Sequence, residues 1–152
     1  MKQTVLCYLE CDGAYLMMHR IKKEVDENRD KWIGVGGKME AGESPFDAAR
    51  REIAEECALT ANKLDYRGII TFVSDEWGTE YMHLFTSSDF TGTLANECDE
   101  GVLEWVKKED IPSLPIWEGD KIFLSLLDTE KRFFSLKLVY QGEKLVEHIL
   151  EI

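Results

Sequence analysis

Three glutamates, Glu52, Glu55 and Glu56, are spaced along the chain in a way that could hold a metal ion. On a helix, residues three and four positions apart are neighbours, so Glu52 shares a face with Glu55 and Glu56 and the side chains are expected to converge. Like charges at that spacing repel each other by about 0.2–0.5 kcal/mol per pair. A divalent cation such as Mg²⁺ would offset this repulsion, since it takes carboxylate and phosphate oxygens as ligands. The three carboxylates therefore predict a divalent-cation site on one helix.

The helix that must position these glutamates has a clear start in the sequence. Ser44 is a good N-cap, Pro45 suits the first helical position, and Asp47 completes a Ser-x-x-Asp capping pattern. We expect the helix to run from Pro45 to about Cys57. Its apolar stripe would lie next to the carboxylate face and consist of Phe46, Ala49, Ile53 and Cys57.

The segment from Gly37 to Leu59 resembles the Nudix box, the signature of hydrolases that act on nucleoside diphosphates linked to another group. A solvated acidic helix is the alternative, and the glycine-rich approach and the distant Glu43 argue against it. One fixed position differs, because Ala58 stands where the family has a glycine. A left-handed residue is favoured at that helix end, so Ala58 is expected to alter the helix exit without removing a ligand. Eight of the nine fixed positions match, namely Gly37, Glu43, Arg51, Glu52, Ile53, Glu55, Glu56 and Leu59.

The resemblance implies roles for the glutamates of the box. Glu52 and Glu56 would be the chief ligands of Mg²⁺, for which Mn²⁺ could substitute, and the Gly37 carbonyl would also coordinate. Glu55 would share a metal or help to activate the attacking water. All three glutamates are thus candidate catalytic residues, and the choice of general base among them stays open. Metal ions suit this chemistry because they neutralise phosphate oxygens and lower the pKa of a bound water.

The arginine of the box is expected to have a structural role. Arg51 would point away from the centre of the carboxylates, pair with Glu43, and fix the preceding loop against the helix. The alternative is an ordinary surface arginine on a helix.

A further metal ligand is expected from the acidic stretch at 96–100. This stretch offers Glu97, Asp99 and Glu100. Comparison with the oxidised-purine triphosphatases of the family aligns Glu100 with a glutamate of the metal site. For any one of the three residues, a charged turn is an equally good interpretation.

The same comparison implies residues that bind the nucleotide. Trp117 matches a tryptophan that stacks on the purine, and Asp120 matches an acid that reads its edge. Stacking on an aromatic face is worth about 1–3 kcal/mol. The alternative for Trp117 is a core position on an amphipathic helix, and both interpretations stay open.

Two positions around the expected substrate site differ from those relatives, and a lysine is also expected there. Ile33, which follows Trp32 as in the relatives, replaces an asparagine that reads the base, and Gly119 replaces a second aspartate. These two replacements put the base specificity in doubt. Lys38 is the remaining residue that we expect at the substrate.

The function implied by the resemblance is that of a Mg²⁺-dependent nucleoside triphosphate pyrophosphohydrolase, which converts NTP and water into NMP and pyrophosphate. Oxidised purine nucleotides such as 8-oxo-dGTP would be among its substrates. One alternative is a Nudix hydrolase of another nucleoside diphosphate derivative, such as a nucleotide sugar or capped RNA. A non-catalytic nucleotide-binding module is a further alternative, which the intact glutamates disfavour.

Composition restricts the partners of the chain. A net charge of −12 argues against binding to long nucleic acid, because that binding depends on Lys and Arg neutralising phosphates. A small nucleotide that arrives with Mg²⁺ avoids this repulsion. No apolar run approaches the ~18 residues needed to cross a membrane. The four cysteines lack zinc-like spacing and are interpreted as small buried hydrophobes of a cytoplasmic protein, monomeric or homodimeric.

The remaining elements predict an α+β fold in one domain, residues 1–152. A second helix is expected at Trp117–Leu127, whereas Ile111–Pro115 should break regular structure. By resemblance, the fold is the α/β/α sandwich of the family, with a mixed β-sheet. The expected strands are Thr4–Glu10, Ala14–Arg20, Trp32–Val35, Lys63–Val73, Thr79–Ser87, Val102–Val106, Phe134–Tyr140 and Lys144–Leu150, with turns at Asp12-Gly13 and Gln141-Gly142.

Overall fold

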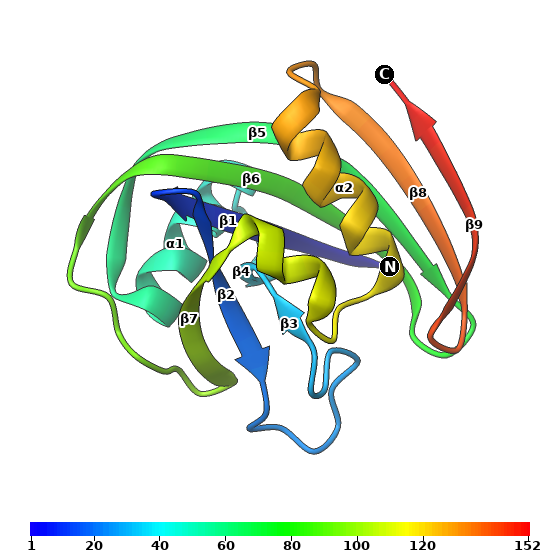
Figure 1. Cartoon of the computed structure of the whole chain (residues 1–152), viewed down its shortest axis with the longest axis horizontal. Helices are drawn as coiled ribbons and strands as arrows, with labels where there is room; N and C mark the ends of the chain where they lie inside the picture. Colours follow the sequence, from blue (N-terminus) through cyan, green and yellow to red (C-terminus); the bar gives the residue numbers. More distant parts are fainter.

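The computed structural model describes all 152 residues and has the α+β architecture with a mixed sheet that was expected from the sequence (Figure 1). The helices are α1 (Pro45–Cys57), the short 3₁₀ helix η1 (Lys108–Ser113) and α2 (Glu118–Thr129). The strands are β1 (Lys2–Cys11), β2 (Ala14–Arg20), β3 (Trp32–Ile33), β4 (Val35–Lys38), β5 (Leu59–Ser74), β6 (Gly78–Gly92), β7 (Gly101–Lys107), β8 (Phe134–Gln141) and β9 (Lys144–Glu151).

The strands pair in the order β3-β2-β1-β6-β5-β8-β9, with β4 paired to β1 and β7 to β2. The pairs β1–β6 and β5–β8 are parallel, and the other pairs are antiparallel. β1 pairs with β4 through Thr4–Cys7 and with β2 through Glu10 and Cys11. This central strand therefore joins the larger part of the sheet to the smaller part formed by β2, β3 and β7.

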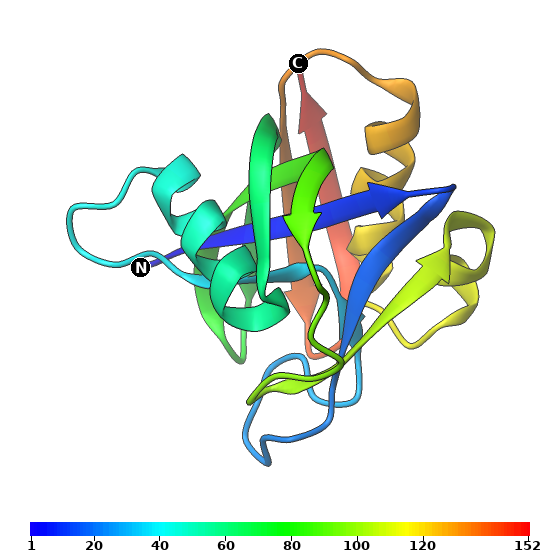
Figure 2. The ribbon, with the colours of Figure 1, turned by 90° about the vertical axis from the view of Figure 1, so that its left-hand side faces the viewer.

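The two long helices cover opposite faces of the sheet (Figure 2). Successive side chains of a strand point to opposite faces. On β1, Leu6 and Tyr8 belong to the hydrophobic cluster that includes Phe123 of α2. The neighbouring Val5 and Cys7 belong to a second cluster, which includes Ile53 of α1. This alternation confirms the sandwich.

Several local predictions are confirmed by the backbone. Asp12 and Gly13 have φ values of 51° and 75°, as a tight hairpin turn requires. The final hairpin turns at Gly142, with φ of 59°. No helix is long and apolar enough to cross a lipid bilayer.

Other local predictions are wrong. The expected strand Trp32–Val35 is two strands, because β3 pairs with β2 whereas β4 pairs with β1, and Gly34 separates them. The segment expected to be irregular contains η1, and α2 begins one residue later than expected, with Trp117 as its N-cap. Cys11 is exposed and Cys98 is only half-buried, so just two of the four cysteines are buried residues.

Candidate active site

Helix α1 begins at the residues that the sequence indicates. Ser44 Oγ accepts a hydrogen bond from the Asp47 backbone N–H at 3.1 Å, and Asp47 Oδ2 accepts one from the Ser44 N–H at 3.0 Å. This reciprocal capping satisfies two backbone donors that a helix start leaves free. At the other end, Ala58 adopts the left-handed conformation with φ of 60°. Alanine thus takes the geometry for which glycine is favoured, at a cost of about 1 kcal/mol.

Strand β4 passes unusually close to α1. A Cβ atom placed on Gly37 would lie 2.8 Å from Oε1 of Glu52, which is inside van der Waals contact. Glycine at this position therefore lets the backbone of β4 approach the carboxylates. The Gly37 carbonyl belongs to the same strand, and Gly37 and Glu52 both line the main cavity.

Arg51 is bonded to three glutamates. Its Nε and Nη2 donate to the two oxygens of Glu43 at 2.7 and 2.9 Å, as the sequence predicts. Its Nη1 also donates to Glu52 at 2.8 Å and to Glu55 at 3.3 Å. The expectation that Arg51 points away from the carboxylates is therefore wrong. The guanidinium sits among them and lowers the pKa of Glu43 below its usual range.

Glu55 and Glu56 differ strongly in their surroundings. Glu55 has a side chain that is 60% exposed, whereas Glu56 is buried and accepts a hydrogen bond from the Gly36 N–H at 3.2 Å. Burial, followed by the hydrogen bond and charge of Glu52 and by the charge of Glu100, raises the pKa of Glu56 to about 9. Glu56 therefore carries a proton at neutral pH unless a cation takes its place.

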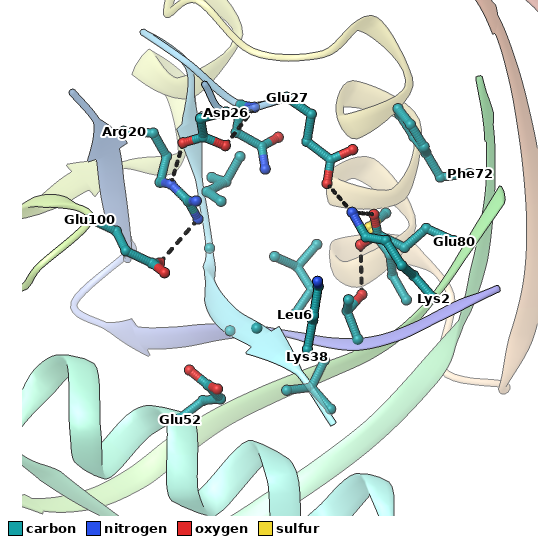
Figure 3. Close-up of a pocket in the computed structure, with 18 of the residues that line it drawn as sticks. Lys2, Leu6, Arg20, Asp26, Glu27, Lys38, Glu52, Phe72, Glu80 and Glu100 are labelled. Carbon is teal, nitrogen blue, oxygen red and sulfur yellow. Dashed lines mark hydrogen bonds and ion pairs between the residues drawn. The ribbon is translucent and has the colours of Figure 1, made fainter. Parts of the chain in front are cut away.

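The carboxylates are not gathered into a closed cage. As they stand, no three acidic, histidine or cysteine side chains form a group that could hold a metal ion. The convergence expected from helical spacing is seen for Glu52 and Glu56, which lie within hydrogen-bonding reach of each other, whereas the side chain of Glu55 is exposed. Arg20 holds Glu100 at 3.2 Å (Figure 3). Lys23 holds the same carboxylate at 3.1 Å, and Arg51 holds Glu52 at 2.8 Å. Burial is the main cause of the raised pKa of Glu56, and Glu52 and Glu100 add to it, as expected for carboxylates that face the same space. This oxygen-only set of donors fits a hard divalent cation.

A single cavity of about 660 Å³ extends from these carboxylates to the start of α2. This volume is in the range of small-molecule sites, about 300–1,000 Å³. Of the expected site residues, those that line it are Ile33, Gly37, Lys38, Arg51, Glu52, Glu55, Glu100, Trp117 and Asp120. Four other expected site residues do not line it, namely Glu43, Glu56, Glu97 and Asp99. Among the three acids at 96–100, the structure thus places only Glu100 at the cavity.

Trp117 is both a core residue and part of the cavity wall. It is only 4% exposed and packs edge-on against Phe72 and Tyr140, with ring centroids 5.2 and 4.8 Å away. Its indole N–H donates to Asn28 Oδ1 at 2.9 Å, and Lys31 Nζ lies 4.5 Å from the ring centroid. A core position and contact with a ligand in the cavity, the two interpretations of this tryptophan, are therefore compatible with each other.

Asp120 lies beside Trp117 in the first turn of α2. It is 7% exposed and makes no hydrogen bond through its carboxyl group. Burial raises its pKa to about 8, and the charge of Lys31 opposes this shift only in part. The preceding residue, Gly119, has no room for a side chain, since a Cβ atom would lie 2.5 Å from Leu138 and 2.7 Å from Tyr140 Oη. Tight packing thus accounts for glycine at 119.

Sequence reasoning missed the residues of the loop 21–31. This stretch is rich in charged residues and matches no motif, yet Lys23, Asp26, Glu27 and Asn28 line the cavity. Two strand residues, Lys2 and Glu80, were also missed, and both line the same cavity. The position of Glu80 within the strand 78–92 is a sequence signal for a functional or paired residue, because a strand interior seldom buries a glutamate without a partner.

Comparison with known proteins agrees with this geometry. The NUDIX domain family matches residues 2–127 of the chain. The chain belongs to the Nudix family. This Nudix protein is 34% identical over 122 residues to the oxidized purine nucleoside triphosphate hydrolase of Danio rerio, which covers 80% of this chain and 78% of the relative.

Two further relatives extend the likeness. The uncharacterized Nudix hydrolase YvcI of Bacillus subtilis is 30% identical to this Nudix protein over 131 residues, 84% of this chain and 79% of the relative. The crystal structure of a MutT protein from Bacillus halodurans superimposes with a TM-score of 0.87 at 25% identity, covering 99% of this chain and 98% of that one. Nearly the whole chain therefore shares the fold of MutT proteins.

Proposed function

We propose that this Nudix hydrolase is a Mg²⁺-dependent nucleoside triphosphate pyrophosphohydrolase, which converts NTP and water into NMP and pyrophosphate. The observation that carries the proposal is the single cavity that has the carboxylates of α1 at one end and Trp117 and Asp120 at the other. Such a space suits a nucleotide with its phosphates at the first end and its base at the second. The name of the relative from Danio rerio, an oxidized purine nucleoside triphosphate hydrolase, supports a triphosphate substrate.

The residues of α1 and its neighbours would divide the work at the phosphate end. Glu52 and Glu56, joined by Glu100 and the Gly37 carbonyl, would hold Mg²⁺. When bound, the ion would neutralise phosphate oxygens and lower the pKa of a water molecule. Glu55 is the most exposed of the three helix glutamates, and it would share a metal or assist in taking the proton of that water.

Two cations of the chain would assist the carboxylates. Arg51 fixes the orientations of Glu52 and Glu55 through its hydrogen bonds, so its contribution is positioning. The ammonium group of Lys38 points into the cavity (Figure 3), where it would meet a phosphate oxygen. Preorganised charges of this kind stabilise the charge that develops during phosphoryl transfer.

Trp117 and Asp120 would bind the base, which we propose to be a purine and to include oxidised purines such as that of 8-oxo-dGTP. The ring of Trp117 would stack on the base and the carboxyl group of Asp120 would meet its edge. Ile33 lines the same cavity without a polar group. Because Ile33 and Gly119 replace polar residues of the relatives, we expect a broader choice of bases than theirs.

A substrate panel with product analysis tests this proposal. The panel contains the common nucleoside triphosphates, 8-oxo-dGTP, a nucleotide sugar and capped RNA, each with Mg²⁺ and with chelator. We expect a triphosphate to be the best substrate and its products to be a monophosphate and pyrophosphate. Release of orthophosphate from a triphosphate, or faster hydrolysis of the sugar or cap derivative, would refute the proposal.

A further inference from the structure

Four polar side chains form a cluster on the cavity wall opposite Arg20 and Glu100 (Figure 3). We call it the Lys2 cluster, and its members are Lys2, Thr4, Glu27 and Glu80, all of which line the cavity. Lys2 Nζ lies 3.0 Å from Glu27 Oε1 and 3.4 Å from Glu80 Oε1. Thr4 Oγ1 donates to Glu80 Oε2 at 2.7 Å.

The sheet and one loop build this cluster. The parallel register of β1 and β6 pairs Lys2 with Glu80, and the register of β5 and β6 pairs Phe72 with Glu80. Glu27 reaches the same point from the loop 21–31. The cluster is therefore held by two strands and completed by the loop.

Glu27 is the member of the cluster with unused hydrogen-bonding capacity. Both oxygens of Glu80 have partners, but Glu27 Oε2 is buried and has none. Buried polar atoms usually have a hydrogen-bond partner, so such an atom calls for an explanation. Burial and the neighbouring Glu80 raise the pKa of Glu27, and the hydrogen bond from Lys2 to Glu27 Oε1 opposes this shift only in part.

The rest of this cavity end also points to a ligand that donates hydrogen bonds. Asp120 is more than nine-tenths buried, lines the same cavity and has no hydrogen-bond partner for its carboxyl group. Apolar side chains of Leu6, Phe72 and Met82 line the space beside these acids. The charge of Lys2 is already shared by two carboxylates, so phosphate would be repelled here. A flat, apolar ring that carries N–H groups suits this environment.

We propose that the Lys2 cluster is a subsite for an exocyclic amino group of a purine base, with the Glu27 carboxyl group accepting its hydrogen bond. This inference rests on the proposed function, since it takes a nucleotide as the occupant of the cavity. An amino group would supply the donor that Glu27 Oε2 lacks. Glu80, fixed by Thr4 and Lys2, would hold Glu27 in place and is a positioning residue.

Binding of monophosphates tests the inference without relying on hydrolysis. The probes are two matched pairs, GMP with IMP and AMP with purine riboside monophosphate, and within each pair only one amino group differs. Titration calorimetry on the full chain should show at least one pair in which the amino-bearing member binds about 10- to 100-fold more tightly, as expected for a hydrogen bond to a charged group.

Substitutions at Glu27 then assign the effect to this residue. Glu27→Leu should abolish the preference, and Glu27→Gln, which keeps the shape and one acceptor, should give an intermediate value. Glu24→Leu is the matched control, because Glu24 belongs to the same loop, is exposed and makes no side-chain contact with a charged partner. Melting curves of each variant confirm that it is folded.

The possible outcomes separate this inference from the proposed function. Equal affinity within both pairs, a preference that survives in Glu27→Leu, or no binding of any monophosphate would overturn the inference. If the amino preference is found and is lost in Glu27→Leu, but no triphosphate is hydrolysed, then the inference stands and the proposed function fails. If triphosphates are hydrolysed without any amino preference, then only the inference fails.

Discussion

Replacing Asp120 with asparagine should remove a pH-dependent loss of stability. The pKa of Asp120 is about 8 in the folded protein, because burial penalises its charged form, against an ordinary value of 3.8. The folded state therefore holds a proton that the unfolded state has released between about pH 4 and pH 8. In this range the free energy of unfolding falls as the pH rises. The Asn side chain does not titrate, so the variant lacks this contribution.

The size of the effect follows from the shift in pKa. The two values differ by about four units, and each unit corresponds to about 1.4 kcal/mol. The difference in free energy of unfolding between the variant and the wild type should thus change by about 1.4 kcal/mol per pH unit in favour of Asp120→Asn. Over the whole range this amounts to about 6 kcal/mol, which is comparable with the total stability of a small domain.

Denaturant unfolding without nucleotide, followed by tryptophan fluorescence at several values between pH 4 and pH 9, measures this difference. Asp110→Asn is the control, since it makes the same substitution at an exposed position. A difference between wild type and Asp120→Asn that stays constant across the range would refute the argument that Asp120 is buried and protonated.

Three further substitutions test the remaining parts of the site. Glu56→Gln should lower kcat at saturating Mg²⁺ by about 100-fold or more. The melting temperature should not fall, because the buried carboxyl group is already protonated. Near-normal turnover of this variant would contradict the role of Glu56. Arg51→Lys should lower kcat and reduce the melting temperature by about 3–6 °C, because lysine lacks the planar guanidinium group that binds three glutamates. Arg50→Lys, at an exposed position, is the control. Equal behaviour of the two variants would contradict the positioning role of Arg51. Trp117→Ala should cost about 3–5 kcal/mol of stability and also raise KM for purine triphosphates, whereas an unchanged melting temperature would contradict its burial.

The parts of the site that rest on local sequence could be predicted. Ser44 and Asp47 are three residues apart and cap the same helix start, so their interaction depends on nothing distant. The pairing of Arg51 with Glu43 is likewise a contact between neighbours, across eight residues. The two faces of β1 also follow from alternation along a strand.

The parts that rest on long-range contacts could not be predicted. Glu80 meets Thr4 across 76 residues, and Asn28 meets Trp117 across 89 residues. No local pattern contains both members of such a pair. The side-chain directions within the carboxylate group were also missed, because helical spacing gives the face of a residue but not the hydrogen bonds that Arg51 makes to Glu52 and Glu55.

The loop 21–31 has a consequence for how this enzyme could acquire new specificities. Its residues contribute to the cavity wall, yet none of them belongs to either hydrophobic cluster. Its attachment to the rest of the molecule includes polar contacts such as those of Asp26 with Arg20, Glu27 with Lys2 and Asn28 with Trp117. Changes of sequence or length in this segment can therefore alter the binding surface while the folded core is preserved. We expect that a loop grafted from another member of the family would change the cavity wall and leave the core folded.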